Sequence, residues 1–205
     1  MIRHLLFTAA AVATLALSTT AQARDAAPAA VVLGDAAAAI APNRYVWEEH
    51  EAAGRVSVVV SKTDQRAYVY RGETLVAVSA VSTGREGKET PAGVFTILQK
   101  KTMHRSNLYD DAPMPFMQRL TWDGVALHAG RNPGYAASHG CVRLPADFAK
   151  KLYAATELGA KVIVLDESVD GESFGGELAS YVTPEQEDAT AVAEANRIAA
   201  SFASR

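Results

Sequence analysis

The strongest pattern in this chain is a series of short apolar runs separated by polar turns. From Arg55 onward these runs are rich in β-branched and aromatic residues and have the length of β-strands. They cover residues 55–60, 66–71, 74–82, 94–100, 123–129 and 161–165. Because a single long helical pattern lies among them, we expect a mainly β domain that spans residues 55–166.

That helical pattern occupies residues 145–159. Pro145 suits the first turn of a helix, and Gly159 is a typical stop. Phe148, Leu152 and Ala155 then fall on one face. The pattern predicts one helix directly after the segment that carries the only cysteine.

A second helix is expected at the C-terminus. Thr183, Pro184 and Gln186 form a capping-box start, and an apolar stripe follows at Val192, Ala195, Ala199 and Phe202. The stretch before it is acidic and rich in glycine. We therefore expect residues 167–205 to form a linker and an accessory helix, either packed on the domain or partly ordered.

Residues 99–118 show neither the period of a helix nor the alternation of a strand, and the segment is long for a loop in a compact domain. Loops of this kind are lids, binding loops or disordered segments. Tyr109, Met114, Phe116 and Met117 make this loop too apolar for plain disorder. We expect it to be a lid over a site.

The first 23 residues have the features of a secretory signal peptide. Arg3 and His4 give a positive start to an apolar run of 13 residues that ends at Leu17, and the small-residue sequence "AQA" ends at Ala23. The run is too short to span a bilayer, and the alternative is an uncleaved interfacial anchor. We expect export to the periplasm, with no transmembrane segment after cleavage.

Residues 24–54 are an Ala/Pro-rich leader that runs into the domain. Residues 24–44 show no helical or alternating period, so we expect them to be flexible. The whole chain has a formal net charge of −3 with acidic and basic residues interspersed. The sequence has no basic stripe that would favour binding to nucleic acid. The pattern of charges does not determine the oligomeric state.

The single cysteine, Cys141, narrows the chemistry. An exported chain usually meets an oxidising compartment, where a lone thiol is an intermolecular link, an inert residue or a reactive group. A neighbouring protonated histidine or aimed backbone N–H groups would lower the thiol pKa. His128 ends an apolar strand and is expected to be the general base, with His139 as a structural or electrostatic neighbour.

The loop "SHGCVR" supplies further candidates. Gly140 permits an unusual turn, so its amide and that of Cys141 could receive the charge of an oxyanion. Arg143 is expected to grip a substrate carboxylate or brace the loop, and Ser138 to act as a hydrogen-bonding loop residue. A zinc site on the cysteine and the two histidines lacks any familiar metal-binding spacing. The residues therefore predict no metal and no cofactor.

Three blocks resemble the L,D-transpeptidase catalytic domain (YkuD-type) family. They are "SHGCVRL" from Ser138, "LHAG" ending at Gly130, and "VSTGREGKETPAGVFTI" from Val81. The resemblance covers residues 55–165 and implies a barrel-like or sandwich domain. The segment "PMPFM" is similar to the family's substrate-covering loop, which places Tyr109 and Met114 among the expected substrate contacts.

The resemblance implies action on the stem peptides of peptidoglycan. Cys141 would attack the carbonyl of the third residue, usually meso-diaminopimelate, and expel the terminal D-Ala as a thioester forms. His128 would be the base, oriented by a backbone carbonyl, and His139, Gly140 and Arg143 would match the remaining motif positions.

The acceptor of that thioester is left open. An amine would resolve it in a transpeptidase and water in a hydrolase, and a non-catalytic wall-binding module is a third possibility. Ala129-Gly130 stands where many members have Gly-Thr or Ser after the base, which leaves the acceptor preference undetermined.

Overall fold

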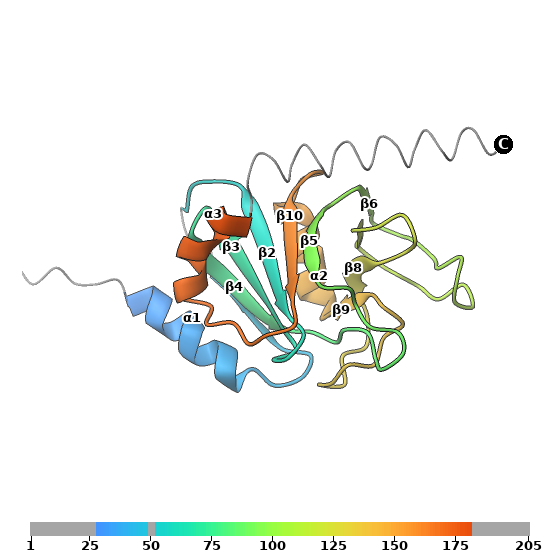
Figure 1. Cartoon of the computed structure of the whole chain (residues 1–205), viewed down its shortest axis with the longest axis horizontal. Helices are drawn as coiled ribbons and strands as arrows, with labels where there is room; N and C mark the ends of the chain where they lie inside the picture. Colours follow the sequence, from blue (N-terminus) through green and yellow to red (C-terminus); the bar gives the residue numbers. More distant parts are fainter. Residues whose placement is uncertain (1–27, 49–51, 182–205) are drawn as a thin grey trace, which may run out of the picture.

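The protein forms two β-sheets that pack together, with helices on both sides of the larger one (Figure 1). The structure is a computed structural model that describes residues 28–48 and 52–181. The predicted signal peptide and C-terminal helix lie outside these residues. The mainly β prediction is confirmed, and the two sheets form a layered arrangement rather than a closed barrel.

The larger sheet has six strands in the order β1-β4-β3-β2-β10-β5. Only β2 and β10 run parallel, and the other neighbours are antiparallel. The strands are β1 (Tyr45–Trp47), β2 (Val56–Ser61), β3 (Arg66–Arg71), β4 (Thr74–Ala80), β5 (Gly93–Thr96) and β10 (Lys161–Leu165).

The smaller sheet has four strands in the order β6-β7-β8-β9, of which β8 and β9 are parallel. They are β6 (Gln99–Lys101), β7 (Met117–Arg119), β8 (Ala126–Ala129) and β9 (Val142–Leu144). The run at 94–100, predicted as one strand, is divided between β5 and β6. The backbone N–H of Ile97 donates to Ala160 beside the larger sheet, whereas that of Leu98 donates to Arg119 in the smaller one.

The main core lies between the two sheets and includes helix α2 (Ala146–Ala155). Phe148 is completely buried there, with its ring 5.5 Å from that of Tyr45 and 5.7 Å from that of Trp47. The helix ends at Ala155, before the predicted stop at Gly159. Thr156 has extended backbone (ψ 158°), and its hydroxyl contacts the Gln118 side chain and the Leu152 carbonyl oxygen.

A second core covers the opposite face of the six-stranded sheet. Helix α1 (Pro28–Ala39), the 3-10 helix η1 (Ser173–Glu177) and α3 (Leu178–Tyr181) lie on that face (Figure 1). They bury Leu33, Phe174 and Leu178 against strand residues such as Val59 and Ile163. The sheet is therefore apolar on both faces and needs a cover on each.

Two sequence predictions are wrong on this face. Residues 28–39 are a helix rather than a flexible leader, and the Arg66 guanidinium donates to the carbonyl oxygens of Ala37 (2.9 Å) and Ile40 (2.8 Å) near its C-terminal end. Residues 167–181 are not a plain linker, since the buried hydroxyls of Tyr68 and Tyr70 hold the carbonyls of that segment. The physical reason is that both segments are stabilised by packing on the apolar surface of the sheet. This packing cannot be predicted from the periodicity of the segments themselves.

Candidate active site

The candidate residues share one face of the four-stranded sheet. Arg119 in β7 pairs with Ala126 in β8, and His128 in β8 pairs with Arg143 in β9. Because side chains alternate along a strand, these four residues and Cys141 lie on the same face. The intervening residues point into the protein and are buried: Gln118, Leu127, Val142 and Leu144.

A pocket of about 800 Å³ opens on this face. It brings together most of the residues that the sequence singled out: Tyr109, Met114, His128, Ser138, His139, Cys141 and Arg143. Gly140 is not among its lining residues. Residues 104–115 of the predicted lid form much of one wall.

The thiol of Cys141 is half-buried and held by backbone groups. Its Sγ donates a hydrogen bond to the Gly124 carbonyl oxygen at 3.4 Å. Burial raises the thiol pKa, against a backbone hydrogen bond from Ala126 and the charges of Arg143 and Arg119, which lower it. The resting group is therefore the neutral thiol, and the lowered pKa expected from the sequence is not found.

His128 is almost completely buried, with 7% of its surface exposed. Its Nδ1 lies 2.8 Å from the Ala129 carbonyl oxygen, which can only accept, so Nδ1 carries the proton and Nε2 has the lone pair. Burial lowers the pKa of His128 to about 4, despite the Ala129 hydrogen bond, and the charges of Arg143 and His104 lower it further. The ring is thus neutral at pH 7, and it makes the kind of backbone-carbonyl contact that the resemblance implies.

The loop before Cys141 is tied to itself. Gly140 has φ +117°, a conformation that glycine adopts readily, and its N–H donates to Ser138 Oγ at 3.1 Å. Ser138 Oγ in turn donates to the Cys141 carbonyl oxygen. Ser138 thus forms two hydrogen bonds within the loop, and its Oγ occupies the Gly140 amide that the sequence assigned to an oxyanion.

Residues 83–90 hold the cysteine loop in place through hydrogen bonds. Thr90 Oγ1 accepts from the Gly84 N–H (2.8 Å) and donates to the Gly140 carbonyl oxygen (2.9 Å). The Ser138 N–H donates to the Thr83 carbonyl oxygen at 3.0 Å. A side chain at Gly84 would meet the Lys88 carbonyl oxygen at 2.0 Å. The sequence assigned no role to single residues of the block "TGREGKETP". These contacts show that Thr83, Gly84 and Thr90 support the cysteine loop.

Replacing Thr90 with valine is expected to lower the free energy of unfolding by about 2–4 kcal/mol. Thr90 is completely buried, so the change leaves the Gly84 N–H and the Gly140 carbonyl without a partner at similar volume. Urea unfolding measures the loss. Thr74→Val, at an exposed strand position, is the control, and equal midpoints for the two variants would contradict this role.

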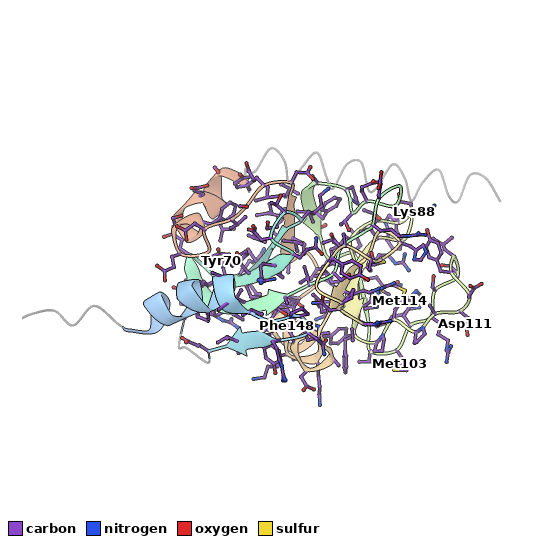
Figure 2. All side chains as sticks on the ribbon, turned by 90° about the horizontal axis from the view of Figure 1, so that it is seen from below. Tyr70, Lys88, Met103, Asp111, Met114 and Phe148 are labelled. Carbon is purple, nitrogen blue, oxygen red and sulfur yellow. The ribbon has the colours of Figure 1, made fainter. Side chains whose placement is uncertain are left out.

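His139 and the lid meet at the rim of the pocket. The exposed His139 ring lies 4.7 Å from the Tyr109 ring, and its Nε2 accepts from Arg85 at 3.1 Å. Met114 is buried at the base of the lid, whereas Asp111 lies toward its far end, in an ion pair with Arg105 at 2.9 Å (Figure 2). His139 is therefore a rim residue that joins the lid to the cysteine loop.

Two other features concern the described residues as a whole. No three of their His, Cys, Asp or Glu side chains are grouped so that they could hold a metal ion. In the same part of the chain, no helix has the length and apolarity needed to cross a membrane.

The free energy of unfolding is expected to fall as the pH drops from about 6.5 to 4, because of His128. The folded ring binds a proton with a pKa of about 4, and the unfolded ring near 6.5. The unfolded state thus holds more protons in this window and is favoured as the pH falls, by about 3 kcal/mol at the low end.

Unfolding curves of the wild type and His128→Asn at pH 7 and pH 4 measure this contribution. Carboxylates titrate in both proteins and affect both equally. The difference between the two proteins in how the free energy of unfolding changes with pH therefore gives the contribution of the His128 imidazole. Parallel slopes would show that the folded ring titrates normally.

The comparisons with known proteins identify the family of this chain. Residues 55–164 match the model of the L,D-transpeptidase catalytic domain, and the chain belongs to this family. One curated relative is the probable L,D-transpeptidase YbiS of Escherichia coli (strain K12), with 28% identity over 55% of this chain. That alignment covers 45% of YbiS, so the chain matches less than half of its relative.

Solved structures support the same assignment. An L,D-transpeptidase from Stackebrandtia nassauensis has 28% identity and a TM-score of 0.51, over 61% of this chain and 60% of that one. An L,D-transpeptidase from Mycobacterium smegmatis has 24% identity and a TM-score of 0.51, over 54% and 58%. The second likeness concerns the fold alone.

Proposed function

We propose that this chain is an exported cysteine L,D-transpeptidase that acts on peptidoglycan stem peptides. Membership of the family supports a peptidoglycan-modifying enzyme. The observation that carries the finer proposal is that the Cys141 thiol and a neutral His128 line one pocket. Export rests on the signal-peptide features of residues 1–23.

In the first half-reaction, Sγ of Cys141 attacks the carbonyl of the third stem residue. The thiol proton passes to Nε2 of His128 as the sulfur–carbon bond forms. The Ala129 carbonyl accepts from Nδ1 and stabilises the resulting imidazolium. His128 then returns the proton to the leaving amine of the terminal D-Ala, and a thioester remains.

The buried pair favours neutral groups at rest. The thiol pKa is raised and the imidazole pKa is low, so proton transfer is unfavourable until a bound carbonyl takes up the negative charge. Since Ser138 occupies the Gly140 amide, the Cys141 N–H and the Arg143 guanidinium are the groups that we assign to the developing oxyanion.

In the second half-reaction, an acceptor amine attacks the thioester carbonyl and gives a proton to His128. The carbon–sulfur bond breaks, and the sulfur recovers the proton. Water in place of the amine would give a free carboxylate. The pocket is therefore compatible with a hydrolase by the same steps, and the products separate the two activities.

The experiment combines the full chain with a synthetic stem tetrapeptide, with and without an amine acceptor. A protein adduct equal to the tetrapeptide without its D-Ala, together with amine-linked product, is expected in mass spectra. Tripeptide alone would identify a hydrolase. The absence of both adduct and product would overturn the enzymatic proposal and favour a wall-binding module.

A further inference from the structure

The pocket contains more positive charge than the chemistry above uses. Arg119, Arg131 and Arg143 all line it, and its one acidic lining residue is the exposed Asp110 of the lid. Within residues 28–48 and 52–181, none of these three arginines forms an ion pair. Guanidinium groups that face a pocket and have no ion-pair partner are suited to binding a carboxylate from a ligand.

Arg119 is the arginine that the fold positions most firmly. Its Nε donates to Gln99 Oε1 at 3.2 Å, from the residue directly opposite on β6. Its guanidinium carbon lies 5.8 Å from the Trp122 ring centroid. These contacts orient the half-buried side chain, while its terminal nitrogens make no hydrogen bond to any part of the described chain.

The register of the sheet places Arg119 and the thiol of Cys141 in one row across the strands, with β8 between them. Arg119 pairs with Ala126, and the backbone of Ala126 hydrogen-bonds to the Cys141 thiol. Cys141 directly precedes β9, which lies two strands away from β7. Two strand spacings amount to about 10 Å, so a ligand whose reacting carbonyl lies at the thiol can reach Arg119 with a group that extends across β8.

A stem-peptide donor carries two carboxylates near the attacked carbonyl. The leaving D-amino acid carries one next to the scissile bond. A diaminopimelate residue at the attacked position carries a second at the end of its side chain. With the attacked carbonyl at the thiol, this second carboxylate can extend across β8 toward Arg119 on β7.

We propose that Arg119 binds the side-chain carboxylate of the attacked donor residue, so that the enzyme selects donors in which this group is free rather than amidated. The inference rests on the proposed function, since it assumes a stem-peptide donor. A carboxamide has nearly the same shape but no charge, and it cannot form a bidentate charged pair with arginine.

A competing role for Arg119 is electrostatic. Its positive charge lowers the pKa of the Cys141 thiol, against the larger effect of burial. Loss of Arg119 would then slow every donor equally, whether or not its side chain is charged. The carboxylate-binding role predicts a loss confined to the free-acid donor, so the two roles are separable.

The test measures calorimetric binding of two tetrapeptide donors, one with the free carboxylate and one with the carboxamide. The full chain with Cys141→Ala is used, so that affinity is measured without turnover. Adding Arg119→Gln is expected to weaken binding of the free acid by roughly 10-fold to 100-fold and to change binding of the amide by less than about 3-fold. Arg55→Gln removes the same charge at an exposed position away from the pocket and is the matched control.

If Arg119→Gln weakens the binding of both donors equally, or of neither donor, the carboxylate-binding role is overturned. Kinetics of the single variant Arg119→Gln should repeat the pattern in kcat/KM. If the wild type turns over neither donor, the proposed function fails, but the affinity ratio still decides the role of Arg119. Thermal unfolding confirms that each variant folds.

Discussion

Replacement of Cys141 with alanine is expected to abolish the thioester adduct and to reduce product formation by roughly 10⁴-fold or more. The reason is that Cys141 is the only thiol of the chain, and its Sγ, which contacts the Gly124 carbonyl oxygen, lines the same pocket as His128. Intact-mass spectra of the protein and chromatography of the stem peptides measure the two effects.

Cys141→Ser is the matched comparison, because it keeps a proton donor toward the Gly124 carbonyl at nearly the same size. The serine variant should bind donor peptide as well as the wild type and fail to turn it over, since a hydroxyl is far less acidic than a thiol. Wild-type turnover by the alanine variant would end the proposal of covalent catalysis.

Replacement of His128 with asparagine is expected to slow thioester formation by roughly 10²- to 10⁴-fold at pH 7. The asparagine amide can still donate to the Ala129 carbonyl in place of Nδ1, but the base at Nε2 is lost. Single-turnover mass spectrometry measures the rate of acylation.

The pH dependence makes this prediction specific. The thiol pKa is raised by burial, so the variant should regain rate only at high pH, where the thiolate forms without a base. The wild type should reach its full rate at lower pH, because His128 accepts the proton once substrate is bound. The same fold-loss at every pH would indicate that His128 is structural.

Much of the fold followed from local sequence pattern. The apolar runs in β2, β3, β4 and β10 are long enough to be recognised, and the helical face of Phe148 and Leu152 marks α2. The strands β1, β7 and β9 have three residues each and leave no detectable period. Helix α1 and the segment 167–181 went unrecognised because their stability comes from covering the second face of the sheet.

The site divides in the same way. The motif around Cys141 and the strand end at His128 were visible as residue types in a specific spacing. The role of Thr90 was not, because it depends on a contact between residues 50 positions apart. Nor was that of Arg119, which reaches the pocket only because β7 pairs with β8.

The sequence by itself determined the mainly β class, the family resemblance and the identity of the candidate nucleophile and base. Tertiary structure alone decided their protonation states: it buries the imidazole against the Ala129 carbonyl and leaves both the ring and the thiol neutral. The physical reason is that a pKa depends on desolvation and on neighbours brought together by strand pairing, neither of which is encoded in the spacing of a motif.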